Sequence, residues 1–275
     1  MTTGKFPIGI FDSGYGGLTV MKEIVRQLPQ YDYCYLGDNA RTPYGNRSFE
    51  TVYAYTLECV QQLFEKGCRL VILACNTASA KALRTIQQHD LPQMAPDRRV
   101  LGVIRPTTEM IGNITRTGQV GIFATSGTVL SRSYILEIEK FFPQIEVFQE
   151  ACPMWVPLVE NNEHNGPGAD YFVRQHIDHL LSASDKIDTI ILGCTHYPLL
   201  MEKIRKYLPE HIQVITQGEI VAKSLSDYLQ RHPELETLCS RHASAEFYTT
   251  DSTELFDSHA AIFYGTKVRS QLLSL

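Results

Sequence analysis

The stretch "RLVILACNTASAKALRTIQQ", residues 69–88, reads as a strand, a turn and a helix in direct succession. Residues 70–74 form a continuous apolar run, which is typical of a strand buried on both faces of a sheet. Small and polar residues follow from Cys75, and a helical pattern fills residues 79–88. Strands followed at once by helices are the repeating unit of α/β proteins with parallel sheets. This segment therefore predicts that fold class.

The same alternation of strand and helix continues along the 275 residues of the chain. Further short apolar runs predict strands at residues 7–11, 33–38, 99–104, 119–124, 145–150, 189–193, 212–216 and 245–250. Helical patterns predict helices near residues 18–28, 48–66, 221–230 and 252–263.

Two pairs of segments resemble each other across the chain. Residues 8–20 resemble residues 120–131, and the surroundings of Cys75 resemble those of Cys194. The members of the two pairs are separated by similar stretches of sequence and come in the same order, which suggests a duplication. We therefore expect two similar α/β domains with mainly parallel sheets in a pseudo-symmetric arrangement. Such halves, facing each other, would direct Cys75 and Cys194 into a shared cleft.

Composition and charge exclude several classes of function. The net charge of −5, with no basic cluster, predicts no nucleic-acid partner. No run approaches the roughly 20 apolar residues of a membrane helix, so we expect no membrane partner. The chain reaches Asp12 before any signal-like apolar core, which argues against secretion. Its seven cysteines are odd in number and form no C-x-x-C pair, which disfavours disulfides and structural zinc and predicts a cytoplasmic protein.

Polar and reactive residues gather where the expected strands end. They are Asp12 and Ser13; Asp38, with Tyr44 and Gly45 beyond it; Cys75, Asn76 and Thr77; and Cys194, Thr195 and His196. Ligands of open α/β sheets bind at the carboxyl ends of the strands, and the free N–H groups of the helices that follow favour anions such as carboxylates. The glycine-rich turn at residues 12–17 matches neither common nucleotide-binding motif.

Two opposed thiols suit the inversion of a carbon stereocentre. One thiolate removes a proton from one face of the carbon, and the other thiol delivers a proton to the opposite face. Cys75 and Cys194 each end a strand where a helix should begin, a position that lowers the pKa of a thiol. The alternative of a nucleophile with a resolving thiol lacks a redox motif. The remaining cysteines are expected to be buried core residues: Cys34, Cys59, Cys68, Cys152 and Cys239.

Seven stretches, taken together, resemble the cofactor-independent glutamate racemases of the aspartate/glutamate racemase superfamily. In chain order they are "FDSGYGGLTV", "GDNARTPYG", "ACNTASA", "FATSGTVLSRSY", "ACPMWVPLVE", "LGCTHYPLL" and "FYTTDSTELFDSHAAIFYG". They span nearly the whole chain. The pair of cysteine motifs is specific, because more distant relatives differ at one or both.

The resemblance implies interconversion of L- and D-glutamate without pyridoxal phosphate or metal, supplying D-glutamate for peptidoglycan in a bacterial cytoplasm, and we expect a homodimer. By motif position, Cys75 would serve the D-enantiomer with help from Asp12, and Cys194 the L-enantiomer with help from His196 and Glu160. The implied substrate-binding residues are Asp12, Ser13, Asp38, Tyr44, Gly45, Cys75, Asn76, Thr77, Thr128, Cys194, Thr195 and His196. The ordinary pKa of an imidazole, about 6.5, would make His196 a workable proton partner.

The family fold implies two domains, the first completed by the C-terminal segment. We place the first domain at residues 1–97 and 213–275 and the second at residues 98–212. The chain departs from the family pattern at Arg105, where an acid is usual, and at Thr216 and Gln217, where Asp-Ser is usual. These departures predict altered electrostatics near the cleft or the domain interface, with changed regulation, oligomer contacts or turnover.

Three other functions remain open at this point. A racemase for aspartate or another small acidic amino acid would use the same pair of thiols. A decarboxylase or cis–trans isomerase is disfavoured, because such relatives use their cysteines differently. A binding protein that keeps an amino-acid pocket, or inhibits a partner, is the non-enzymatic alternative.

Overall fold

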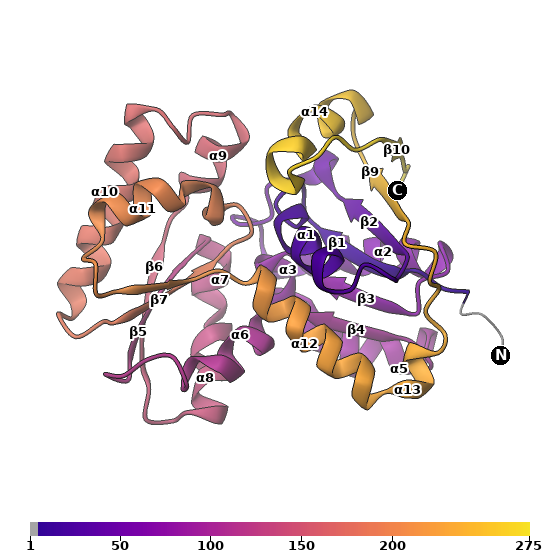
Figure 1. Ribbon diagram of the computed structural model, residues 1–275, viewed down its shortest axis with the longest axis horizontal. Coiled ribbons are helices and arrows are strands. Elements are labelled where there is room, and N and C mark those ends of the chain that lie inside the picture. The colour runs from indigo at the N-terminus through magenta and orange to yellow at the C-terminus, as the bar shows by residue number, and fades with distance from the viewer. Residues whose placement is uncertain (1–4) are drawn as a thin grey trace.

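The computed structural model describes residues 5–275, and it has two parallel sheets flanked by helices (Figure 1). One sheet has the strand order β10-β9-β2-β1-β3-β4, and the other has the order β6-β5-β7-β8. The strands are β1 (Ile8–Asp12), β2 (Tyr33–Gly37), β3 (Leu70–Leu73), β4 (Arg99–Gly102), β5 (Gln119–Ala124), β6 (Glu146–Ala151), β7 (Thr189–Gly193), β8 (Gln213–Ile215), β9 (Ala245–Thr249) and β10 (Ser270–Leu272). The predicted α/β class with parallel sheets is confirmed.

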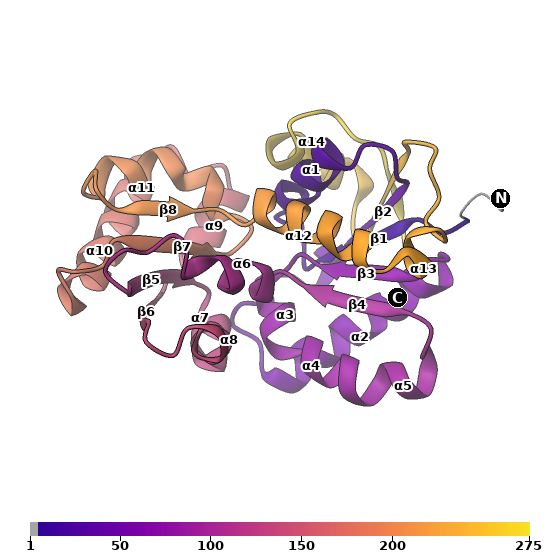
Figure 2. The same cartoon turned by 60° about the horizontal axis from the view of Figure 1, so that its bottom comes forward.

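The helices lie on both faces of each sheet (Figure 2). They are α1 (Leu18–Gln27), α2 (Phe49–Glu65), α3 (Asn76–Lys81), α4 (Leu83–Thr85), α5 (Leu91–Met94), α6 (Ile104–Ile111), α7 (Ser126–Ser131), α8 (Ser133–Phe141), α9 (Trp155–Glu160), α10 (Pro167–Ala183), α11 (Met201–Tyr207), α12 (Gly218–Arg231), α13 (Pro233–Glu236) and α14 (Thr253–Tyr264). Short 3₁₀ turns lie at Asn39–Arg41 and Tyr197–Leu200, and a π-helical turn lies at Ile86–Asp90.

We call the part around the six-stranded sheet the first lobe and the part around the four-stranded sheet the second lobe. In the first lobe, α1, α12 and α14 lie on one face of the sheet and α2 to α5 on the other (Figure 2). The strand interiors are fully buried, as in β1, β2, β3 and β7, because helices cover both faces. Across residues 5–275, none of the helices is both long enough and apolar enough to span a membrane.

The strand next to each expected domain boundary pairs with the sheet of the other lobe, not with the domain to which the sequence analysis assigns it. β4 pairs with β3 in the first sheet, although residues 98–212 were assigned to the second domain. β8 pairs with β7 in the second sheet, although residues 213–275 were assigned to the first. Each is an edge strand that follows its neighbour in sequence, and the lobe changes only after the strand has ended. The chain therefore crosses between lobes at the start of α6 and again at the start of α12.

Several predicted elements differ in their details from the structure. Ile104 begins α6, so the strand expected at residues 99–104 ends early, at Gly102. The helix expected at residues 79–88 is broken into α3, α4 and a π-helical turn. The predicted helix near residues 48–66 is confirmed as α2, capped by the Ser48 side chain, which accepts from the Thr51 N–H.

Candidate active site

A cavity of about 130 Å³ lies between the two lobes and is lined by both Cys75 and Cys194. Nine predicted substrate-binding residues line it: Ser13, Tyr44, Gly45, Cys75, Asn76, Thr77, Cys194, Thr195 and His196. Asp12, Asp38, Thr128 and Glu160 do not line it. The structure therefore brings the strand-end residues of the two lobes together around one small chamber.

Cys75 lies at the end of β3 and caps α3. Its sulfur accepts from the Ala78 N–H at 3.4 Å and lies 3.4 Å from the Ser13 hydroxyl. Burial, and after it the nearby charge of Asp12, raise the pKa of the Cys75 thiol to about 12, against the lowering by the hydrogen bonds with Ser13 and Ala78. The expected lowering by the helix N-terminus is thus outweighed. At neutral pH Cys75 is held as a neutral thiol.

Cys194 follows β7 in a different setting. The next element is the 3₁₀ turn Tyr197–Leu200, so the helix expected to begin at this cysteine is absent. The Cys194 sulfur lies 4.0 Å from His196 Nδ1, and His196 Nε2 lies 3.1 Å from Glu160 Oε1. Glu160 at the end of α9 therefore supports His196 from outside the cavity.

His196 is strongly biased toward its protonated form. Burial opposes the charged ring, but the hydrogen bonds to Cys194 and Glu160 outweigh this and raise the pKa of His196 to about 10. The two thiols therefore lie in different surroundings, with the charge of Asp12 near Cys75 and the ring of His196 near Cys194.

Asp12 lies beneath the cavity, between the two cysteine motifs. It is 1% exposed, its Oδ1 accepts from the Gly14 N–H at 3.0 Å, and its Oδ2 accepts from the Thr195 hydroxyl at 3.5 Å. Burial raises the pKa of Asp12, although the positive charge of His196 opposes the rise. Asp12 thus interacts with groups on both sides of the cavity.

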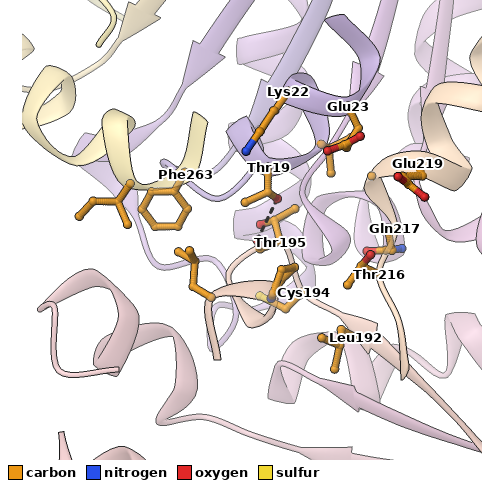
Figure 3. Close-up of a pocket in the computed structure, with 15 residues that line it drawn as sticks. Thr19, Lys22, Glu23, Leu192, Cys194, Thr195, Thr216, Gln217, Glu219 and Phe263 are labelled. Atoms are coloured by element: carbon orange, nitrogen blue, oxygen red, sulfur yellow. Dashed lines mark hydrogen bonds between the residues drawn. The ribbon is translucent and has the colours of Figure 1, made fainter. Parts of the chain in front are cut away.

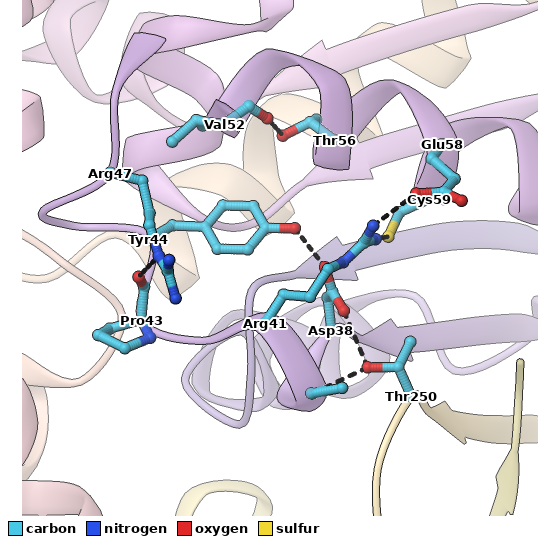
Figure 4. Close-up of polar contacts among 11 residues, drawn as sticks. Asp38, Arg41, Pro43, Tyr44, Arg47, Val52, Thr56, Glu58, Cys59 and Thr250 are labelled. Carbon is cyan, nitrogen blue, oxygen red and sulfur yellow. Dashed lines mark hydrogen bonds and ion pairs between the residues drawn. The ribbon is translucent and has the colours of Figure 1, made fainter. Parts of the chain in front are cut away.

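Asp38, expected to bind substrate, is instead enclosed by other side chains (Figure 4). It is fully buried and accepts hydrogen bonds from Arg41 Nε at 2.7 Å, the Tyr44 hydroxyl at 2.5 Å and the Thr250 hydroxyl at 2.8 Å. The Tyr44 hydroxyl is therefore engaged by Asp38, although Tyr44 itself lines the cavity with Gly45. Asp38 holds the loop that carries Tyr44 and Gly45.

Hydroxyl groups from α3 and α7 join the lobes at the cavity wall. The Thr77 hydroxyl lies 2.9 Å from that of Thr125 and 3.5 Å from that of Thr128. Thr125 and Ser126 line the cavity, but the sequence reasoning did not select them. Thr125 corresponds to Ser13 in the repeat of residues 8–20 and 120–131, and each directly follows its strand, so the internal repeat contained a signal for this position.

Gly16, which the sequence analysis did not select, allows the two lobes to approach each other closely. A Cβ atom at this position would lie 2.2 Å from Thr195 Oγ1 and 2.5 Å from His196 Nδ1. Both atoms belong to the Cys194 motif, so a methyl group here would displace the proposed proton-transfer partner of Cys194. The glycine-rich turn of residues 12–17 thus serves this contact.

We expect the Gly16→Ala substitution to lower kcat/KM by up to about 10²-fold, because an ångström-scale displacement in a catalytic site costs that much. The measurement is the rate of the racemisation that the sequence motifs lead us to expect, assayed with both glutamate enantiomers. Gly168→Ala is the matched control, since the added methyl group has no atom within 4 Å apart from its chain neighbours and the backbone of its own helix. Equal activity of the two variants would show that the close approach at Gly16 has no catalytic importance.

A second cavity, of about 280 Å³, lies behind Cys194 between α1, α12 and α14 (Figure 3). Its lining includes Thr19, Gln217 and Phe263, and the Thr19 hydroxyl donates to the Thr195 carbonyl at 3.0 Å. Cys75 does not line this cavity. The smaller chamber is therefore the candidate active site, because it alone of the two is lined by both thiols.

Residues 8–225 match the model of the family described as Asp/Glu/Hydantoin racemase. The chain belongs to this family. A glutamate racemase from Geobacter metallireducens is 39% identical over 95% of this chain and 93% of its own length. A solved glutamate racemase isoform from Bacillus anthracis is 35% identical, with a TM-score of 0.89 over 99% of this chain and 98% of its own.

A third relative was solved with a ligand. The glutamate racemase from Francisella tularensis, in complex with D-glutamate, is 32% identical to this chain. Its TM-score is 0.86, and the match covers 98% of this chain and 97% of that one. The resemblance inferred from the motifs is confirmed at the level of family and fold.

Proposed function

We propose that this protein is a glutamate racemase that inverts the Cα atom of glutamate with two thiols and no cofactor. The observation that most directly supports this proposal is that Cys75 and Cys194, from different lobes, line the same chamber of about 130 Å³. The relatives named glutamate racemase, matched over nearly the full length of the chain, support glutamate as the substrate.

In the direction from L- to D-glutamate, the Cys194 thiolate takes the Cα proton. The electron pair of the broken C–H bond is held on Cα and delocalised into the α-carboxylate. The Cys75 thiol then delivers its proton to the opposite face of Cα. Cys194 ends as a thiol and Cys75 as a thiolate, and the reverse reaction uses the same steps in the opposite order.

The environment of each sulfur fits this assignment of roles. The imidazolium of His196 stabilises the Cys194 thiolate before the reaction, and the raised pKa of Cys75 keeps its proton available. When Cys75 becomes a thiolate, the Ala78 N–H at 3.4 Å and the Ser13 hydroxyl at 3.4 Å stabilise the charge. Asp12 accepts or returns the proton on the Cys75 side.

Neutral donors are proposed to hold the carboxylates of the substrate. Ser13, Asn76, Thr77 and Thr195 all line the chamber and carry N–H or O–H donors. Together with the backbone N–H groups near Gly45, they can bind both carboxylates. Donors of this kind leave the negative charge of the substrate in place, where it interacts favourably with the His196 imidazolium.

The biological role proposed is the supply of D-glutamate for peptidoglycan in a bacterial cytoplasm. The relatives described above come from bacteria, which supports this setting. A homodimer is proposed as the working assembly. Aspartate is the rival substrate, because two opposed thiols would act on it in the same way.

The decisive experiment incubates the purified protein with L- or D-glutamate in D₂O without added cofactor. We expect the circular dichroism signal to decay to zero from either enantiomer, while deuterium replaces the Cα proton. Parallel reactions with L- and D-aspartate test the rival substrate. Faster inversion of aspartate would replace the proposed substrate, and activity only after addition of pyridoxal phosphate would refute the cofactor-independent mechanism.

A further inference from the structure

Gln217 lies between β8 and α12, where the chain returns to the first lobe. Its side chain is 4% exposed and does not line the chamber that holds both thiols. It lines the second cavity, on the far side of Cys194 (Figure 3). The proposed reaction gives this buried amide no role.

The Gln217 amide connects the two crossovers between the lobes. Its Nε2 lies 3.2 Å from the Val103 carbonyl and 3.1 Å from the Thr107 hydroxyl, at the outgoing crossover and the start of α6. Gln217 itself belongs to the returning crossover. One side chain therefore fixes both chain passages at the base of the site.

The same amide closes a ring of three hydrogen bonds with Asn76 and Tyr134. Asn76 Nδ2 donates to Gln217 Oε1 at 2.6 Å, and Gln217 Nε2 donates to the Tyr134 hydroxyl at 2.9 Å. The Tyr134 hydroxyl donates in turn to Asn76 Oδ1 at 2.7 Å. Each group gives one hydrogen bond and receives one within the ring. The Val103 carbonyl can only accept, so the Gln217 atom that faces it must be Nε2, and this fixes the direction of all three hydrogen bonds.

The ring determines which way the Asn76 amide faces. Its oxygen is committed to Tyr134, and one hydrogen of Nδ2 is committed to Gln217. The second Nδ2 hydrogen is not used by the ring, and Asn76 lines the active chamber next to Cys75. A flipped Asn76 amide would place its oxygen against Gln217 Oε1 and its NH₂ group against the donating Tyr134 hydroxyl. Both contacts would leave buried polar groups unpaired.

We propose that Gln217 is a positioning residue that holds the Asn76 amide in the orientation that presents its free N–H to a substrate carboxylate. The inference rests on the proposed racemase function. Glutamine is needed because an ionised glutamate would offer no donor to Tyr134 or to the Val103 carbonyl. The Tyr134 hydroxyl would then turn toward that carboxylate, and Asn76 Oδ1 would lose its donor.

The test compares Gln217→Glu with the wild-type enzyme in steady-state racemase assays from pH 6 to 9. We expect the KM for L-glutamate to rise about tenfold at pH 8, the size of a lost hydrogen bond to a charged group. We expect kcat to change less, since Asn76 binds the substrate and the transition state alike. The defect should shrink at low pH, because burial raises the pKa of the new carboxyl group and its protonated form again donates.

Gln87→Glu is the control for the change of amide to carboxylate. Gln87 Nε2 also donates to a backbone carbonyl, that of Val100 at 2.7 Å, but it belongs to the π-helical turn outside the site. We expect this variant to retain the wild-type KM and pH profile. A merely structural role for Gln217 would lower the melting temperature of Gln217→Glu without changing its KM or pH profile relative to this control, and that result would overturn the inference.

Tyr134→Phe removes one member of the ring and tests the inference if Gln217→Glu does not fold. A raised KM in Tyr134→Phe supports the ring, and an unchanged KM overturns it. Where both variants fold, the double variant should add little to either single change, because the ring is already open. A wild-type protein that does not racemise glutamate would refute the proposed function instead, so the two failures are distinguishable.

Discussion

Replacing either Cys75 or Cys194 with alanine will stop racemisation of both glutamate enantiomers, with an expected loss of about 10⁴-fold in kcat. Inversion needs a base on one face of Cα and an acid on the other, and the chamber is lined by one thiol from each lobe. Removing either sulfur therefore blocks both directions. Circular dichroism of each enantiomer with the purified variants measures the loss.

Cys239→Ala is the matched control for these variants. Its thiol is 4% exposed and donates to the Leu235 carbonyl away from the chamber. We expect this variant to keep wild-type activity, with only the stability cost of a small buried truncation. Near-normal racemisation by Cys75→Ala or Cys194→Ala would refute the two-thiol mechanism.

A glutamate analogue that carries a chlorine atom on Cβ distinguishes the roles of the two thiols. Removal of its Cα proton by one thiolate forms the Cα–Cβ double bond as chloride leaves, so a second thiol is not needed. We expect Cys75→Ala to eliminate chloride only from the analogue with the configuration of L-glutamate, and Cys194→Ala only from the analogue with the configuration of D-glutamate. Chloride release with the opposite preference would exchange the roles assigned to the two cysteines.

The strand-end motifs predicted most of the candidate site because parallel strands bring their carboxyl ends to one edge of a sheet. Ser13 and Asn76 are far apart in sequence but both line the chamber, as expected. Asp38 satisfied the same rule, yet its carboxylate is occupied by Arg41, Tyr44 and Thr250. The position of an acid at the end of a strand does not reveal whether neighbouring side chains already donate hydrogen bonds to its carboxylate.

The electrostatics of Cys75 could not be read from the sequence. Its place at a helix start predicted a lowered pKa, but complete burial and the charge of Asp12 raise it. The burial depends on how the two lobes close over Cys75, and the charge of Asp12 acts on it because β1 and β3 are neighbours in the first sheet. At Cys194 the expected helix is absent, and the ring of His196 lies beside the sulfur instead.

The departures from the family pattern also needed the structure for their interpretation. Arg105 is exposed and pairs with Glu109 one helical turn away, so its charge lies on the surface of α6. Exposed pairs of this kind contribute little to stability. Gln217 is buried and linked to Asn76, so this neutral departure is the one that reaches the site.

The variants Asp12→Asn and His196→Gln are each expected to lower kcat/KM by about 10³-fold, the middle of the range for a lost proton-transfer partner. The equilibrium constant between enantiomers is one, so kcat/KM must fall equally in both directions. The distinction between the two sides of the chamber therefore has to appear in isotope effects. Asp12 assists the Cys75 step, and His196 assists the Cys194 step.

In Asp12→Asn, proton transfer at Cys75 becomes the higher barrier, so the deuterium isotope effect on kcat/KM should be larger with α-deuterated D-glutamate than with the L-enantiomer. His196→Gln should show the reverse order. Equal isotope effects in both variants, or orders opposite to these, would contradict the assignment of one helper to each thiol. The melting temperature of each variant, compared with wild type, excludes unfolding as the cause.

The pH profile gives an independent measure of His196. Its pKa is raised to about 10, so the imidazolium is present below that pH and is lost as the pH rises through it. We expect wild-type kcat/KM to fall across that range, because the Cys194 thiolate loses its positive partner. In His196→Gln this fall should disappear, since glutamine does not titrate, whereas Asp12→Asn should keep it. A fall of the same size in His196→Gln would assign the titration to another group, and the proposed pairing of His196 with Cys194 would then be wrong.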